Sequence, residues 1–406
     1  MNGLRILMVA PQPFLRPRGT PFSVLHRVRA LLAQGHTVDL VTYPFGDDVA
    51  LDGLSIIRSA RPPGVHDVKI GPSAGKILLD LPLFALAWKM ARKGGYDLVH
   101  THEEAGVLGG WIRRRFGLPH LYDMHSSLPL QFHNFGRFDF RPVVATFERL
   151  EIFTLDQADG VIAICDALGE RARAVGYQGP LEVIENTLDL PAPPAPEGFL
   201  AALRRDLGLE GGPVVAYTGT LEAYQGMGLL LAAAVQVHAR RPDVRFLVVG
   251  GTPEESDALA REARVLGIDG SLRTVPAVAP DQVRHYQSLA DILVTTRTRG
   301  TNTPLKIYQY LRSDRPIVAT DIHSHTQVLD QETAKLVSPD AEGVAAGILT
   351  LVEDPEQRAR LAASATRLAR ERFSDEAYHA RLRRIVEATH GGRTPHGRGS
   401  GSRVPA

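Results

Sequence analysis

Three cations surround the predicted start of a helix in the stretch TRTRGTNTPLKIYQYL, which begins at Thr296. They are Arg297, Arg299 and Lys306. Because the first turn of a helix already presents free N–H groups and the positive end of the dipole, three cations there are unfavourable unless an anion is bound. The stretch therefore predicts a site for a phosphate or diphosphate.

The residues between these cations are suited to a turn that approaches a ligand. Gly300 permits close backbone approach, and Pro304 suits the first helical position, so a helix is predicted over residues 304–311. An alternative stays open, in which Thr303 is only an N-cap and the cations form a solvated face.

Two histidines and two glutamates follow another predicted strand, in the segment HTHEEAG. They are His100, His102, Glu103 and Glu104. Such a set invites a metal hypothesis, but its spacing matches no standard zinc motif, and a glutamate at a helix N-terminus is an ordinary partner of the dipole. We therefore predict no metal at this segment.

A further histidine follows the next predicted strand, in the segment DMHSSLP. A histidine just beyond a strand end can donate to a developing charge or to a hydroxyl group, which makes His125, with the neighbouring Ser126, a candidate for catalysis. The alternative is a structural histidine that is satisfied by a loop carbonyl.

Glycines follow three more predicted strands. Gly19 precedes a helix, where an anion or a sugar hydroxyl would be favoured, although a tight turn alone would also explain it. Gly219 with Thr220, and Gly250, repeat this strand–glycine pattern in the second half of the chain.

The elements that must position these residues are strands alternating with amphipathic helices. The predicted strands of the first half are LRILMVA, TVDLVTY, LSIIRS, YDLVHTH, PHLYDMH, ADGVIAIC and LEVIEN. Those of the second half are PVVAYTG, VRFLVVGG, LRTVPA, ADILVTT, RPIVATD and AKLVS. This alternation predicts an α/β protein with two doubly wound parallel sheets, whose ligands lie beyond the carboxyl ends of the strands.

The length of the chain and its prolines suggest where the domains divide. A chain of 406 residues usually exceeds one core, and four prolines between Leu188 and Gly198 predict an extended linker. We predict a first domain over 1–188, a linker over 189–198, a second domain over 199–373, a helix over 374–390 that starts at Ser374 and packs back on the first domain, and a disordered tail over 391–406.

Composition narrows the class of protein. The net charge of +1 argues against a nucleic-acid binder. The single cysteine, Cys165, excludes an internal disulfide, is predicted to be a small buried residue, and fits a reducing, cytoplasmic location. The N-terminus lacks the features of a signal peptide, and no apolar run reaches the roughly 20 residues of a membrane span.

Nearly the whole chain resembles the retaining glycosyltransferases of family four, which have the GT-B fold. GHTVDLVT resembles the first helix-to-strand turn of that family, VIENTLDL the segment before its linker, and GTNTPLKIYQYLRSDRPIVAT its donor-binding segment. The resemblance implies two Rossmann-like domains with a cleft between them. It also implies transfer of a sugar from a nucleotide diphosphate sugar to a hydroxyl acceptor (a glycan, a lipid or a small molecule), with retention of configuration and without a metal or other cofactor.

The donor-binding segment departs from the pattern of the family at two acidic positions. The family has two glutamates eight residues apart, whose positions are Thr301 and Gln309 in this chain. The second glutamate of the family holds the ribose hydroxyls. A glutamine at that position can still donate and accept hydrogen bonds, but it carries no charge.

Two cations of the family are missing as well. Where the family has an arginine and a lysine for the diphosphate, this chain has Thr220 and Gln225. A diphosphate leaving group still needs its charge balanced, so we expect Arg297, Arg299 and Lys306 to replace them.

These patterns and the resemblance together give a set of predicted site residues. The predicted catalytic residues are His125, Arg299 and Lys306. The predicted donor-binding residues are Gly19, Gly219, Thr220, Gln225, Gly250, Arg297, Gly300, Thr301, Asn302, Thr303, Pro304, Leu305 and Gln309. The predicted acceptor-side residues are Glu103, Glu104 and Ser126.

Two other functions remain open at this point. A nucleotide-sugar epimerase on the same two-domain plan would need no acceptor, and the missing acids and cations would also fit a degenerate protein that only binds nucleotides or sugars. Membrane contact is open too. The segment over 75–95 is apolar and ends in basic residues, so either a core helix or a helix lying on an anionic bilayer, where a lipid-linked acceptor would be met, explains it.

Overall fold

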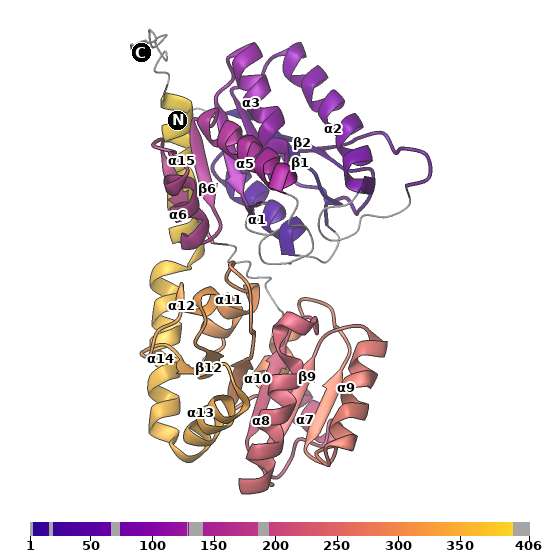
Figure 1. Cartoon of the computed structure of the whole chain (residues 1–406), viewed down its shortest axis with the longest axis vertical. Helices are drawn as coiled ribbons and strands as arrows, with labels where there is room; N and C mark the ends of the chain where they lie inside the picture. Colours follow the sequence, from indigo (N-terminus) through magenta and orange to yellow (C-terminus); the bar gives the residue numbers. More distant parts are fainter. Residues whose placement is uncertain are drawn as a thin grey trace. The chain divides into compact units, whose positions relative to one another are not determined.

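The computed structural model describes residues 3–15, 19–65, 74–127, 129, 141–185 and 195–392. The chain divides into two compact units (Figure 1). The first unit comprises Met1–Ile184 with His379–Ala406, and the second comprises Glu185–Tyr378. Most of the predicted linker, residues 189–194, lies outside the described residues, as does the predicted tail from residue 393.

The first unit is built on a parallel sheet of seven strands in the order β3-β2-β1-β4-β5-β6-β7. The strands are β1 (Arg5–Ala10), β2 (Thr37–Thr42), β3 (Leu54–Arg58), β4 (Leu98–His102), β5 (His120–Met124), β6 (Gly160–Ala163) and β7 (Leu181–Val183). All seven strands predicted for the first half of the chain are present. The order reverses between β1 and β4, and such a switch point opens a ligand-binding crevice at the carboxyl ends of the strands.

Helices cover both faces of this sheet. They are α1 (Gly19–Ala33), α2 (Ala74–Lys93), α3 (Ala105–Phe116), α5 (Arg141–Asp156), α6 (Asp166–Ala174) and, from the end of the chain, α15 (Asp375–Gly391). Burial on both faces explains why the strands are continuous apolar runs rather than alternating ones. The predicted small buried residue Cys165 is 2% exposed, between β6 and α6.

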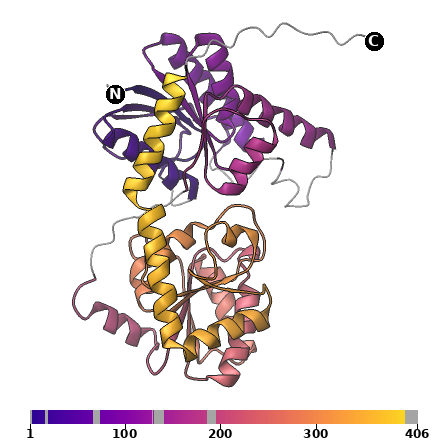
Figure 2. The ribbon, with the colours of Figure 1, turned by 90° about the vertical axis from the view of Figure 1, so that its left-hand side faces the viewer.

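Most of the last helix, from His379 onward, belongs to the first unit (Figure 2). The Ser374 hydroxyl accepts a hydrogen bond from the Ala377 N–H, which is the predicted N-cap contact. Further along α15, Arg384 binds Glu182 through two hydrogen bonds of 3.0 and 3.2 Å, and Arg381 donates to the Val183 carbonyl. These contacts hold the helix beside the edge strand β7.

The second unit has a parallel sheet of six strands in the order β10-β9-β8-β11-β12-β13. The strands are β8 (Val214–Thr218), β9 (Arg245–Val249), β10 (Leu272–Val275), β11 (Ile292–Thr295), β12 (Ile317–Thr320) and β13 (Lys335–Val337). The helices are α7 (Phe199–Asp206), the 3₁₀ turn η1 (Ala223–Gln225), α8 (Met227–Arg240), α9 (Pro253–Val265), α10 (Val283–Ser288), α11 (Leu305–Leu311), α12 (His323–Thr326), α13 (Ala341–Glu353) and α14 (Pro355–Arg372). All six strands predicted for the second half are present, and the switch point lies between β8 and β11.

The apolar segment over 75–95 forms α2, which contributes to the core and also has an apolar exposed face. Leu79 and Leu83 are fully buried against the first sheet. On the other side, Ile77, Leu78 and Leu81 are 64%, 50% and 64% exposed. Among the described helices, none has the length and apolar character to cross a membrane.

Candidate active site

Two glycines at the carboxyl end of the second sheet leave room for close backbone contacts. Gly219 follows β8 and Gly250 follows β9, with φ angles of +144° and +143°. A Cβ on Gly219 would lie 2.8 Å from Lys306 Nζ, and a Cβ on Gly250 would lie 1.7 Å from the carbonyl oxygen of Gly219. Only glycine fits either position, because φ is positive and no space is left for a side chain.

Lys306 is a buried lysine whose hydrogen-bond partner is uncharged. Its Nζ donates to Gln225 Oε1 at 3.2 Å and lies 3.6 Å from the centre of the Tyr217 ring. Burial lowers the pKa of Lys306 well below its ordinary value, and the positive charge of Arg297 lowers it further. Within the part of the chain that the structure describes, no carboxylate lies within ion-pair distance of Nζ.

The two positions where the family has cations lie beside this lysine. Gln225 Nε2 donates to Thr220 Oγ1 at 3.3 Å, while the amide oxygen of Gln225 accepts from Lys306. The structure therefore brings together two residues that the sequence assigned to donor binding, Thr220 and Gln225, and one that it assigned to catalysis, Lys306. Lys306, from α11, thus places an amino group beside Gln225, the position at which the family has a lysine.

Arg297 contacts its own loop rather than open space. Its Nε donates to the Arg299 carbonyl at 2.7 Å and one terminal nitrogen donates to the Asn302 carbonyl at 2.8 Å. A Cβ on Gly300, whose φ is +131°, would lie 2.1 Å from the guanidinium. Arg297 thus holds the loop around Gly300 in shape. Two of its N–H groups, which the sequence analysis expected to bind a ligand, donate to carbonyl groups of this loop instead.

The start of the next helix differs by one residue from the prediction. Pro304 is the N-cap of α11, with extended ψ of 135°, so the helix starts at Leu305 and not at Pro304. Thr303 is buried but makes no capping contact, so the N-cap alternative for that residue is wrong.

Three other residues of the predicted donor segment lie near the surface. Arg299 is exposed, and Thr301 and Gln309 are half-buried. The Thr301 hydroxyl donates to the side-chain oxygen of Asn302 at 3.3 Å, and its carbonyl accepts from Gln327 at 2.7 Å.

The carboxyl end of the first sheet holds a buried ion pair that sequence analysis missed. Arg27 Nε, from α1, lies 2.9 Å from Asp123 Oδ2, at the end of β5, and these side chains are 1% and 0% exposed. Burial alone would raise the pKa of Asp123, but the Arg27 guanidinium and the neighbouring imidazoles hold it well below its ordinary range. The carboxylate is therefore ionised in the interior.

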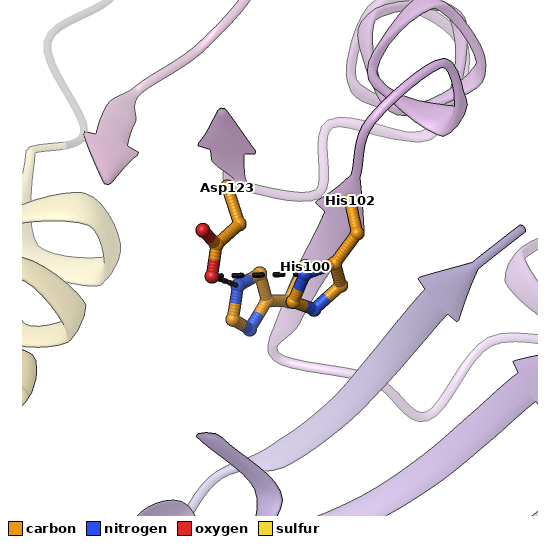
Figure 3. A group of neighbouring side chains, drawn as sticks. All are labelled: His100, His102 and Asp123. Carbon is orange, nitrogen blue, oxygen red and sulfur yellow. Dashed lines mark ion pairs between the residues drawn. The ribbon is translucent and has the colours of Figure 1, made fainter. Parts of the chain in front are cut away.

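Three histidines surround this carboxylate. The register pairs His102 of β4 with Asp123 of β5, and the two-residue period of a strand places His100 on the same face (Figure 3). His100 Nε2 and His102 Nδ1 lie 3.5 and 3.6 Å from Asp123 Oδ2. The predicted catalytic residue His125 is 4% exposed, and its Nε2 lies 3.0 Å from His102 Nδ1 and 3.4 Å from Asp123 Oδ1.

The residue types of this cluster are those of a metal site, but the charge of Arg27 beside Asp123 disfavours a bound metal ion. Ligand atoms of His100, His102 and Asp123 all lie within 4.8 Å of one another. However, Asp123 Oδ2 already binds the Arg27 guanidinium, and a metal ion there would place a second buried cation on the same oxygen. Burial also lowers the pKa of His100 and His102, so both are neutral hydrogen-bonding groups in the absence of a metal.

The predicted acceptor-side glutamates form a second polar group at this edge. Lys76 Nζ, near the start of α2, lies 2.6 Å from Glu104 Oε1 and 3.4 Å from Glu103 Oε2. Tyr43 donates a 2.5 Å hydrogen bond to Asp80 nearby. Burial and the charge of Glu103 raise the pKa of Glu104 to about 8, although Lys76 acts in the opposite direction.

Two predicted residues of the first unit have fewer described contacts. Gly19 is the first residue of α1 rather than the residue before it, and Ser126 is half-buried beyond β5. The residues that the sequence analysis missed could have been found from one signal. Asp123 is a charged residue inside a predicted strand, two positions before His125. Because residues two apart in an extended chain lie on the same face, Asp123 could have been predicted to lie beside His125.

Comparison with known proteins agrees with this arrangement. Residues 17–191 match the family described as Glycosyltransferase Family 4, and residues 212–354 match the family described as Glycosyl transferases group 1. A D-inositol 3-phosphate glycosyltransferase of Rhodococcus jostii is 30% identical over 335 residues, which cover 77% of this chain and 72% of the relative. This chain belongs to glycosyltransferase family 4.

Other relatives extend over almost the whole of this family 4 enzyme. A D-inositol 3-phosphate glycosyltransferase of Rhodococcus erythropolis is 27% identical, covering 91% of the chain and 88% of the relative. A phosphatidyl-myo-inositol mannosyltransferase of Mycolicibacterium smegmatis is 26% identical, covering 96% and 95%. The chain is accordingly a nucleotide-sugar-dependent glycosyltransferase that retains the anomeric configuration.

Solved structures show the same fold. The sucrose-phosphate synthase of Thermosynechococcus elongatus superimposes with a TM-score of 0.77 at 22% identity, covering 96% of this chain and all of that one. The Anabaena protein HepE, in complex with UDP, superimposes with a TM-score of 0.71 at 19% identity, covering 95% and 100%. The GT-B fold predicted from the sequence is confirmed.

Proposed function

We propose that the second unit of this glycosyltransferase binds the diphosphate of its donor through Lys306. The observation that carries the proposal is the burial of this lysine beside Gly219, where the partners that it contacts among the described residues, Gln225 and Tyr217, are uncharged. A buried ammonium without a counterion is costly, and a diphosphate would supply the missing charge. As the nucleoside diphosphate leaves, the growing negative charge on its oxygens would be stabilised by the same cation.

Other residues have supporting parts in the binding of the donor. The glycines after β8 and β9 expose backbone that a side chain would cover, and Gln309, one helical turn from Lys306 on α11, is proposed to contact the ribose. Arg299 is proposed to add an exposed charge to the phosphate region. Arg297 is proposed to act indirectly, by holding the Gly300 loop in shape.

The first unit is proposed to serve the reacting sugar and the acceptor. His125 lies at the end of β5 and offers an imidazole to a hydroxyl group. Glu103, Glu104 and Ser126 are proposed to accept or donate hydrogen bonds to acceptor hydroxyls. Because Lys76 lies within ion-pair distance of both glutamates and Glu104 has a raised pKa, little net charge is left at this edge, which is proposed to face the hydroxyl groups of a polyol rather than a phosphate.

Binding followed by product analysis tests this function. Calorimetry with UDP, GDP and ADP and their sugars should yield one preferred base, with binding weakened by about 10²-fold or more in Lys306→Met. Incubation of that donor with myo-inositol, inositol phosphates and phosphatidylinositol should give a new glycoside of retained configuration by NMR. Epimerisation of the donor alone, or tight binding without turnover on any acceptor, would contradict the proposal.

A peripheral membrane contact is proposed through α2. The exposed side chains Ile77, Leu78 and Leu81 form an apolar face, and the last turn of the helix carries Arg92 and Lys93. Flotation with liposomes containing anionic lipid should recover the protein. Replacing the three aliphatic residues with serine should abolish flotation, whereas equal recovery of this variant would contradict a role for α2.

A further inference from the structure

The strands β8 and β11, on either side of the switch point of the second sheet, are paired over only part of their length. The register of β8 with β11 ends at the pair Ala216–Leu293, whereas that of β8 with β9 continues to Thr218. One step further along, a regular parallel ladder would join the N–H of Thr218 to the carbonyl of Val294. A side chain from a helix lies at this point instead.

Tyr310, near the end of α11, supplies that side chain and is fully buried. Its Oη accepts a hydrogen bond from the Thr218 N–H at 2.8 Å. The same Oη lies 3.5 Å from the Val294 carbonyl oxygen and 3.4 Å from that of Thr218, so its proton has acceptors within reach. The phenol hydroxyl thus bridges the ends of β8 and β11.

The side chains of Thr218 and Gln287 complete the same network. Gln287 Nε2, from α10, donates to Thr218 Oγ1 at 3.1 Å. An amide nitrogen can only donate, so the Thr218 hydroxyl directs its own hydrogen to Tyr310 Oη, which lies 3.3 Å away. Burial raises the pKa of Tyr310 to about 12, so the phenol keeps its proton. Each donor therefore has an acceptor, and the network favours one arrangement of the three side chains.

This network holds both sides of the close contact between Lys306 and Gly219. Gly219 directly follows Thr218, and a Cβ on this glycine would lie 2.8 Å from Lys306 Nζ. Lys306 precedes Tyr310 by four residues on α11, so the two side chains leave the same face of the helix. A shift of Tyr310 relative to Thr218 would therefore move the amino group relative to the glycine.

We infer that Tyr310 is a positioning residue of the donor site, whose hydroxyl joins α11 to the end of β8 and so holds the Lys306 amino group over Gly219. The inference rests on the proposed function, in which Lys306 binds the diphosphate of the donor. Tyr310 acts through Lys306 and is not itself a catalytic residue.

The hydrogen bond at the centre of the inference can be tested in the full-length, ligand-free protein. Tyr310→Phe keeps the ring but removes the acceptor of the Thr218 N–H. Hydrogen exchange of the Thr218 amide, resolved by mass spectrometry with fragmentation, should become about 10-fold faster or more, while the amides of β9 keep their rates. An unchanged rate at Thr218 would overturn the inference, because that amide would then not depend on Tyr310.

Double-mutant cycles separate positioning of Lys306 from a general loosening of the site. In calorimetry with whichever of UDP, GDP and ADP the wild type prefers, Tyr310→Phe should weaken binding by about 10-fold. Added to Lys306→Met, it should change binding by no more than about 2-fold, because the group that it positions is already absent. Added to Arg299→Ala, the two losses should multiply. Multiplication in both cycles, or binding as tight as wild type in Tyr310→Phe, would overturn the inference.

Two further variants serve as controls. Tyr308→Phe removes a hydroxyl from another buried tyrosine of α11, whose ring packs on Phe373, and should bind as the wild type does. Thr218→Val keeps the backbone N–H that donates to Tyr310, so it should lose less affinity than Tyr310→Phe, and a larger loss would overturn the role of the phenol. If none of the three nucleotides binds to the wild type, the proposed function of Lys306 is wrong, whereas the exchange rate at Thr218 still decides whether Tyr310 joins α11 to β8.

Discussion

The carboxyl ends of the two sheets bury charge in opposite ways. In the first unit, the buried cation Arg27 lies 2.9 Å from the carboxylate of Asp123. In the second, the contacts of the buried Lys306 side chain among the described residues are with an amide oxygen and an aromatic ring. Both sites lie at a switch point of the strand order, where such folds bind ligands.

This difference indicates what each unit can bind. The charges of the first unit neutralise one another, so its edge is suited to uncharged hydroxyl groups. The second unit buries a lysine whose charged form is disfavoured in the ligand-free protein and would be compensated by an anion. Removing the cation should therefore have effects of opposite sign on the stability of the two units.

The largest expected effect is in the first unit. Arg27→Met would leave Asp123 as a buried uncompensated charge, and we expect a loss of about 3–5 kcal/mol in the free energy of unfolding. Urea unfolding followed by circular dichroism measures this change. Arg29→Met, on the exposed side of the same helix, should stay within about 0.5 kcal/mol of wild type. If the two substitutions changed the free energy of unfolding equally, the Arg27–Asp123 pair would not stabilise the first unit in the way proposed.

The matching change in the second unit should act on binding instead. Lys306→Met should weaken binding of the preferred nucleoside diphosphate by about 10²-fold or more, because a charge-assisted contact is lost in a dry site. The unfolding temperature of the ligand-free protein should stay the same or rise, since the variant no longer buries a charge. Calorimetry measures the change in binding and thermal unfolding measures the change in stability, with Lys335→Met as the control for both. A clear loss of stability with unchanged binding would mean that Lys306 is structural.

The sequence predicts the fold better than it predicts these two sites. Every strand was found, because strands buried on both faces of a parallel sheet appear as continuous apolar runs. The start of α11 was misplaced by one residue, since Pro304 fits either an N-cap or a first helical position until its ψ is known. Local chemistry fixes elements but leaves their ends uncertain.

Contacts between residues far apart in the sequence explain why the two sites were predicted less well than the fold. Arg27 and Asp123 are 96 residues apart and meet only when α1 packs on the sheet, so no local pattern announces the pair. Arg297 looked like a ligand cation, yet carbonyl groups of its own loop take two of its nitrogens. The sequence suggested Lys306 as a replacement for the cations missing at positions 220 and 225, and the fold places its Nζ beside Gln225, whose amide contacts Thr220, because all three follow strands of one sheet.

A third, smaller effect concerns protons in the first unit. Glu104 has its pKa raised to about 8, from an ordinary 4.5, by burial and by Glu103, so the folded state binds more protons than the unfolded state between these values. Stability should therefore fall as pH rises from 4.5 through 8, by less than the roughly 5 kcal/mol that the full difference in pKa would give, because the side chain is partly exposed to water. Glu104→Gln should flatten this slope in urea titrations at several pH values, whereas the exposed control Glu170→Gln should keep it. An unchanged slope in Glu104→Gln would show that this glutamate is ionised in the fold.

The smallest expected effect separates exposed from buried charge within the second unit. Arg299 is exposed, and water and salt screen a surface charge far more than a buried one. Arg299→Ala should weaken nucleoside diphosphate binding by about 3–10-fold at low ionic strength, and the difference should largely vanish at 0.5 M salt. The effect of Lys306→Met should persist there, because that charge is shielded by protein. Calorimetry at two salt concentrations measures both variants, and a salt-independent loss in Arg299→Ala would show that Arg299 closes over the phosphate and shares the role assigned to Lys306.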